Sequence, residues 1–113
     1  MFGYFSVDRT PTTAVANPVP NDTATLTRGA QLYAQDCAVC HGVSGKGDGT
    51  YGAQLNPRPA DLTGTHITTH TDGDLYWWIS HGIAGTGMPA WSGTLSDQDM
   101  WALVRYLRTL RNA

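Results

Sequence analysis

Glutamate is absent from this sequence, so all nine of its acidic side chains are aspartates, and Lys46 is its only lysine. The formal net charge is −2, which argues against the strongly basic surface that binds nucleic acids. No apolar run is long enough to span a membrane. The first residues, MFGYFSVDR, lack the positive start and the apolar stretch of an intact signal peptide. We therefore expect a processed chain or a domain cut from a longer one.

Cysteine is also scarce, and both cysteines lie in CAVCHG, residues 37–42. A zinc site needs four ligands, and His66 and His70 are the histidines whose spacing would complete one. A thioredoxin-like redox pair needs a βαβ context, which is missing, and a disulfide across two residues would be strained and close almost no loop. C-x-x-C-H is, in contrast, the signature of covalent haem attachment. Haem is the favoured interpretation, with the zinc site and the redox pair as alternatives.

The chain divides at about residue 24 into an N-terminal arm, residues 1–24, and a compact domain, residues 25–113. Residues 10–24 hold three of the six prolines and almost no bulky side chain, a composition typical of an extended linker. We expect this arm to lie outside the domain and to act as a tether or a docking arm, with FGYF near its start as a candidate docking peptide. A ragged terminus without function is the alternative.

Three helices are expected in the domain, over about 26–37, 71–82 and 96–112. Each has apolar residues at helical spacing, and the second and third also carry capping residues at their starts. Residues 42–70 read instead as a long loop without the alternation of a β-strand. Aliphatic residues are few for a domain of this size, so something else must supply apolar mass at its centre.

Met88 is the leading candidate for a second iron ligand, opposite the histidine of the haem motif. It lies in GTGMPAW, a glycine-rich loop after the second predicted helix. An iron that only transfers electrons needs a sixth ligand, and a methionine thioether there raises the reduction potential. The rival ligands are His66, His70, His81 and Met100. Of these His81 is the most credible, because Met100 lies on the apolar stripe of the third helix. Filling a gap in the core is the alternative role of Met88.

Three groups of residues follow one another in a characteristic order, namely Gly29-x-x-x-Tyr33-x-x-x-Cys37-x-x-Cys40-His41, then Met88-Pro89, then Leu103-x-x-Tyr106-Leu107. Over about residues 25–112 the chain thereby resembles the class I c-type cytochromes, and more narrowly the single-haem domains tethered to bacterial respiratory complexes. The resemblance implies an all-α cytochrome c fold, with three to five helices and long loops around one haem c. It also implies thioether bonds from Cys37 and Cys40 and axial ligation by His41 and Met88.

Four further residues are candidates for the haem pocket. Arg58 and Tyr51 would pair with the haem propionates, as a guanidinium fork and a phenol can. Trp78, or its neighbour Trp77, would pack on the haem or donate its indole N–H, and Trp91 would cover the face on the side of Met88. A solvated loop position for the arginine and plain core packing for the tryptophans are the alternatives.

The acceptor for the ring proton of His41 stays open at this point. The family often places a proline about ten residues after the haem histidine, and the carbonyl of that proline fixes the imidazole. Here residues 50–53 are Thr-Tyr-Gly-Ala, and the first prolines after the motif are Pro57 and Pro59.

The predicted function is that of a single-electron carrier or relay domain, which performs no bond chemistry on a substrate. The implied redox partners are a quinol-oxidising complex, a terminal oxidase or a small copper or haem carrier. The implied location is the periplasm, or the outer face of the bacterial cytoplasmic membrane. Arg105, Arg108 and Arg111 form a candidate partner surface, with helix-end charge as the alternative. A haem enzyme, or a gas or peroxide sensor with an open sixth site, is the competing function.

Overall fold

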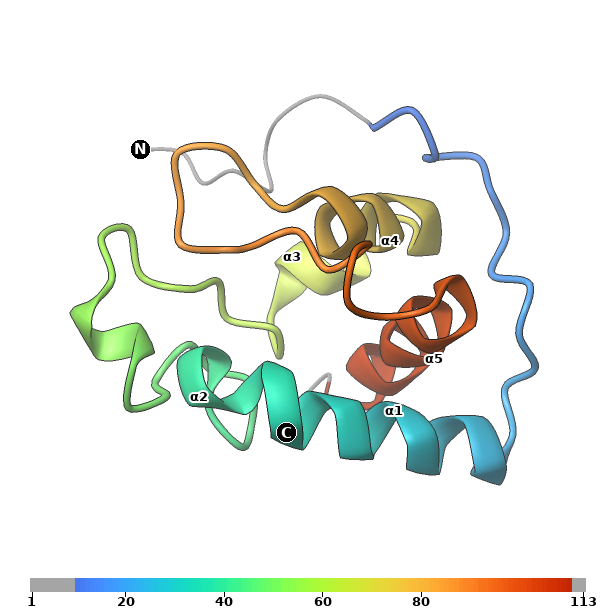
Figure 1. The fold of residues 1–113 in the computed structure, drawn as a ribbon, viewed down its shortest axis with the longest axis horizontal. Coiled ribbons are helices and arrows are strands. Elements are labelled where there is room, and N and C mark those ends of the chain that lie inside the picture. The colour runs from blue at the N-terminus through green and yellow to red at the C-terminus, as the bar shows by residue number, and fades with distance from the viewer. Residues whose placement is uncertain (1–9, 111–113) are drawn as a thin grey trace.

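The computed structural model describes residues 10–110, except for the side chains of Thr65 and His66, so the candidacy of His66 as a ligand lies outside the described residues. These residues form an all-α fold without strands, as predicted (Figure 1). The α-helices are α1 (Thr23–Asp36), α2 (Ala38–His41), α3 (Thr65–Thr68), α4 (Asp72–His81) and α5 (Asp97–Leu107), with 3-10 turns η2 (Gly52–Gln54) and η3 (Arg108–Leu110). None of these helices is long and apolar enough to cross a membrane.

Side-chain caps fix the starts of the three longer helices. Asp22, Thr71 and Ser96 each accept a hydrogen bond from a backbone N–H three residues later, at 2.9–3.1 Å. The predicted helices over 26–37 and 71–82 therefore correspond to α1 and α4. The third was predicted to reach residue 112, but α5 ends at Leu107 and tightens into η3. Residues 111–113 lie outside the described part of the chain.

The helices α1 and α5 cross in direct contact (Figure 1). A Cβ on Gly29 would lie 2.5 Å from the Ala102 carbonyl oxygen and 2.7 Å from the Cβ of Tyr106. The rings of Tyr33 and Tyr106 pack beside this point with centroids 5.3 Å apart. The predicted close approach of these helices at Gly29 is confirmed.

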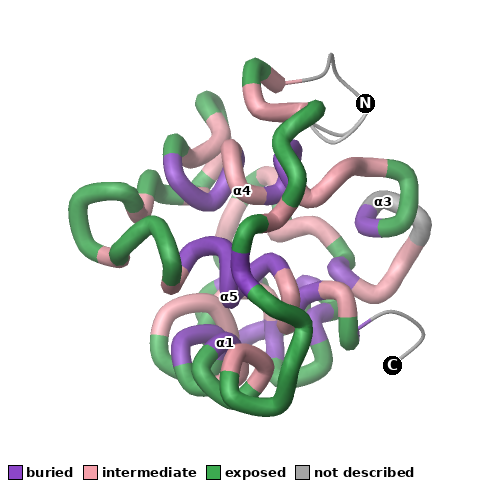
Figure 2. Tube along the Cα trace, turned by 90° about the vertical axis from the view of Figure 1, so that its right-hand side faces the viewer, coloured by how far each residue is buried: buried purple, intermediate pink, exposed green. Residues whose placement is uncertain are grey.

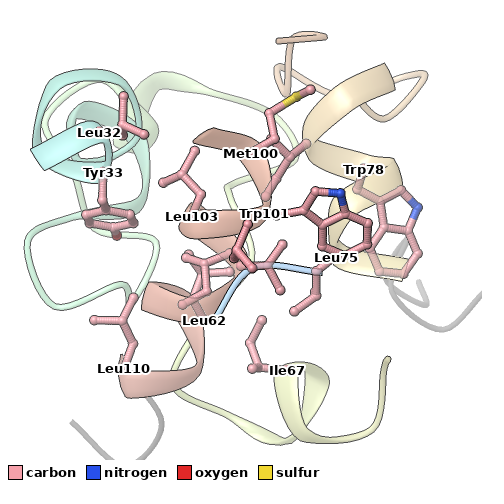
Figure 3. Close-up of a cluster of buried hydrophobic side chains, with 14 residues drawn as sticks. Leu32, Tyr33, Leu62, Ile67, Leu75, Trp78, Met100, Trp101, Leu103 and Leu110 are labelled. Atoms are coloured by element: carbon pink, nitrogen blue, oxygen red, sulfur yellow. The ribbon is translucent and has the colours of Figure 1, made fainter. Parts of the chain in front are cut away.

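Buried side chains from α1, α4 and α5 meet in one core (Figure 3). Leu103 and Val104 of α5 are almost fully buried at its centre. The region 42–70, predicted as a long loop, contributes Leu62 and Ile67 to the same core, and it contains η2 and α3. Apolar contacts therefore hold this region against the helices, in addition to the chain connections at its two ends.

The described part of the N-terminal arm, residues 10–22, lies along the domain (blue in Figure 1; the burial of each residue is shown in Figure 2). Val19 is buried, and the Asn17 side-chain amide donates to the Trp101 carbonyl at 3.1 Å. The Arg105 guanidinium donates to the Val19 carbonyl through Nη2 at 2.7 Å. The prediction that the arm lies outside the domain is therefore wrong for residues 10–22.

The physical reason is that the carbonyls of Asn17 and Val19 in this proline-containing segment accept hydrogen bonds from the Arg105 side chain of α5. The predicted division of the chain at residue 24 stays a prediction. Phe2, Tyr4 and Phe5, the aromatic cluster of the proposed docking peptide, lie outside the described residues.

Candidate functional site

An apolar cavity of about 390 Å³ lies between the end of α1, α2, the loop before α3, the helices α4 and α5, and the loop after α4. Leu75 and Trp78 of α4 and Leu103 of α5 are among the apolar residues that line it. Its volume falls in the range of small-molecule and cofactor sites. A cavity lined in this way is a site for a large apolar group.

One wall of the cavity carries the CAVCH motif. The Cys37 carbonyl accepts hydrogen bonds from the N–H groups of Cys40, at 3.2 Å, and His41, at 2.9 Å. This single turn brings both thiols and the imidazole to the cavity. No disulfide joins the two cysteines. Burial raises the pKa of Cys37 to about 12 and also raises the pKa of Cys40, which is the direction opposite to the lowered pKa of a reactive redox thiol.

His41 is held by a backbone carbonyl that the sequence did not reveal. Its Nδ1 lies 3.1 Å from the Ala60 carbonyl oxygen, which can only accept, so Nδ1 carries the proton and Nε2 keeps its lone pair. Burial lowers the pKa of His41, and this hydrogen bond only partly offsets the effect. The acceptor follows Pro59, one of the two prolines considered from the sequence. The neutral tautomer is the form that ligates a metal.

Met88 also lines the cavity, from the loop after α4. The Thr86 hydroxyl accepts from the Met88 N–H at 3.1 Å and donates to the Ile83 carbonyl at 2.7 Å. The loop leaves α4 at Gly82, whose φ of 74° is left-handed, and whose added Cβ would lie 2.8 Å from the Met88 carbonyl oxygen. A tight, hydrogen-bonded turn therefore presents the thioether.

The three rival ligands whose side chains the structure describes, His70, His81 and Met100, do not line the cavity. The exposed His81 ring stacks on Trp77 with centroids 3.6 Å apart, and its Nδ1 lies 2.7 Å from the Ser80 hydroxyl. Met100 is buried in the core, as its place on the apolar stripe indicated, and His70 bonds to Asp74. Within the described part of the chain, no cluster of three or more His, Cys, Asp or Glu side chains could hold a metal ion.

Of the four further candidates for the haem pocket, three line the cavity and one does not. Tyr51, Trp78 and Trp91 line the cavity, and Trp78 rather than its neighbour Trp77 is the one that does so. Arg58 is not among the described residues that line it, and its Nη2 donates to the Gly47 carbonyl at 3.3 Å.

The arginines of α5 and η3 are engaged within the domain. Arg108 donates to Asp72 at 2.8 Å through Nε, to the His70 carbonyl at 2.7 Å through Nη2, and to the Ile67 carbonyl through Nη1. Arg105 holds the N-terminal arm, as described above. Two of the three arginines considered as a partner surface therefore have internal structural roles, and Arg111 lies outside the described residues.

Comparison with known proteins gives consistent matches. Residues 24–107 match the family model described as cytochrome C oxidase, cbb3-type, subunit III. The chain is 33% identical over 97 residues to the cbb3-type cytochrome c oxidase subunit FixP of Azorhizobium caulinodans, covering 86% of this chain but only 31% of that protein. It is also 33% identical over 90 residues to cytochrome c-554(547) of Halothiobacillus neapolitanus, covering 74% of this chain and 93% of that one.

A similar fold occurs in the solved reducing HAO-like protein complex of Kuenenia stuttgartiensis. The TM-score is 0.73 and the sequence identity is 28%, and the match covers 92% of this chain and 52% of the other.

Proposed function

Since this chain belongs to the cytochrome C oxidase, cbb3-type, subunit III family, as a single-haem c-type cytochrome domain, we propose that it relays single electrons through one haem c bound in the cavity. One observation carries the proposal: two thiols, a histidine and a methionine line the same apolar cavity, although they come from distant parts of the chain. That donor set and an apolar wall are what a covalently held, six-coordinate haem requires.

Cys37 and Cys40 would hold the haem through thioether bonds at the end of α1 and in α2. His41 would ligate the iron through Nε2, because the Ala60 carbonyl occupies Nδ1 and fixes the ring. Met88 would supply the sixth ligand. When bound, the haem supplies an iron that cycles between the ferric and ferrous states.

The apolar wall and the methionine act together on the reduction potential. Leu75, Trp78 and Leu103 would give the haem an apolar surround, and a low-dielectric surround disfavours the extra charge of ferric iron. Thioether ligation acts in the same direction, because it favours the ferrous state. We therefore expect a higher potential than histidine as the sixth ligand would give.

The redox partners and the location are proposed from the family. The FixP relative is a subunit of a cbb3-type cytochrome c oxidase, and this chain spans about a third of it. A quinol-oxidising complex, a terminal oxidase or a small copper or haem carrier would exchange electrons with the domain on the periplasmic side of the membrane. Such a partner would approach the haem edge at the cysteine wall, near the exposed Val39 and Val43.

Met88→Ala tests this assignment. In the haem-loaded protein it should remove the weak red absorption band of methionine-ligated ferric haem and lower the reduction potential. Met100→Leu is the matched control, because Met100 is buried in the core and is not among the residues that line the cavity. An unchanged band in Met88→Ala would contradict the assignment. A parent protein whose ferric iron binds ligands as an open site would favour a haem enzyme or sensor instead.

A further inference from the structure

A buried carboxylate outside the cavity, that of Asp74, joins two separate parts of the chain. Its exposed fraction is 0%. Oδ1 accepts hydrogen bonds from the hydroxyls of Thr10, at 3.1 Å, and Thr13, both in the N-terminal arm. Oδ2 accepts from His70 Nδ1 and from the Thr71 amide, each at 3.2 Å. The carboxylate therefore ties the arm to the start of α4.

Capping α4 does not require this set of partners. Asp99 stands at the same position in α5, where its N–H bonds to the Ser96 cap, but its carboxylate pairs with the exposed Arg28 at 2.9 Å. At α4 the arm instead approaches so closely that a Cβ on Gly73 would lie 1.7 Å from the Thr12 carbonyl oxygen. The Thr12 hydroxyl also donates to the Gly73 carbonyl at 2.6 Å. The junction of arm and helix is thus specific to α4.

The helix that Asp74 anchors forms one wall of the cavity. Leu75 follows it directly, and Trp78 lies one turn further on; both line the cavity. Asp74 also orients His70, whose ring packs edge-on against Trp78 with centroids 5.0 Å apart and planes at 83°. Asp74 is therefore connected to the cavity wall in two ways, along α4 to Leu75 and Trp78 and through the His70 ring to Trp78.

The other end of α4 carries the Met88 loop. The Ile83 N–H donates to the Met88 carbonyl at 3.3 Å, and the Trp91 N–H donates to the Ile79 carbonyl at 3.0 Å. The loop is attached to the end of α4 by these bonds, so a shift or fraying of α4 moves the thioether.

We propose that Asp74 is a positioning residue for the Met88 side of the haem site. By holding the arm against the N-terminus of α4, it keeps that helix and the Met88 loop seated on the cavity. Loss of the anchor raises the fraction of molecules in which the thioether is off the iron. This inference rests on the proposed function, because it requires that Met88 ligates the iron.

Imidazole binding to the ferric, haem-loaded protein tests the inference, because an added ligand competes with Met88 for the iron. The apparent affinity rises with the fraction of molecules whose sixth site is open. We expect Asp74→Asn to bind imidazole about tenfold more tightly than the parent, which corresponds to about 1.4 kcal/mol. Asp99→Asn is the matched control, and it should bind imidazole as the parent does.

Thr13→Val is a second test that keeps the buried carboxylate and removes one hydroxyl donor from the arm. It should raise the apparent affinity by about threefold. If Asp74→Asn and Thr13→Val melt at lower temperatures but bind imidazole like the parent, the anchor is merely structural and the inference is overturned. A Met88→Ala variant with an unchanged spectrum overturns the proposed function as well, so the two failures are distinguishable.

Discussion

Gly29→Val should separate α1 from α5 and destabilise the domain. The first added carbon would lie 2.5 Å from a backbone carbonyl oxygen and 2.7 Å from the Cβ of Tyr106, roughly 1 Å short of ordinary contact. Neither neighbour is the end of a flexible side chain, so the helices themselves must move. Overpacking of this kind costs about 1–3 kcal/mol. Valine recovers only part of the helix propensity that glycine lacks, so the net effect remains destabilising.

The assay is thermal unfolding of the haem-loaded protein, followed by far-ultraviolet circular dichroism. A loss of 1 kcal/mol lowers the Tm of a domain of this size by about 4–8 °C. Gly93→Ala is the matched control, since an added Cβ there has no neighbour within 4 Å. That variant should melt with the parent or slightly above it. If Gly29→Val also melts with the parent, the two helices do not cross closely and the argument is refuted.

Three further predictions concern the cofactor, the arm and a tyrosine. The apo form of a Cys37→Ala, Cys40→Ala variant should be largely unfolded by circular dichroism, because its apolar cavity would stay unfilled; a native-like spectrum would contradict this. Deleting residues 1–20 should cost about 2–3 kcal/mol through lost burial and hydrogen bonds, and an unchanged Tm would show that the arm contacts contribute nothing. The hydrogen bond to Asp97, with partial burial, raises the pKa of Tyr76 to about 12 from 10.0. The Tyr76–Asp97 hydrogen bond should therefore stabilise the fold fully below pH 10, and this stabilisation should be lost as the pH rises through about 12. Asp97→Asn should make one phenol ionise at a lower pH in an absorbance titration.

Local signals in the sequence were enough to predict the long helices. The caps at Thr71 and Ser96 and the glycine after α4 act within a few residues of their own positions. The course of residues 10–22 was not predictable in this way. It depends on Asn17 and Val19 meeting α5, which is distant in the sequence, and composition carries no trace of such a contact.

The residues of the candidate site also fall into those that the sequence predicted and those that it could not predict. The predicted Tyr51, Trp78 and Trp91 line the cavity, and of these Trp78 is buried whereas Tyr51 is exposed. Arg58 was proposed because a guanidinium fork suits a propionate, and residue type does not fix the direction of a loop side chain. The Ala60 carbonyl could not be identified, because a backbone acceptor has no residue type of its own.

The crossing of α1 and α5 also affects the rate of folding. Arg28 and Asp99, which pair beside it, are 71 residues apart, so nearly the whole domain is one loop closed by this contact. Closing so long a loop costs entropy before any packing compensates for it, and contacts of this kind slow folding. A haem held by His41 and Met88 would divide that loop into shorter segments. We therefore expect the loaded chain to refold faster than the apo chain, even under conditions chosen to give both the same final stability.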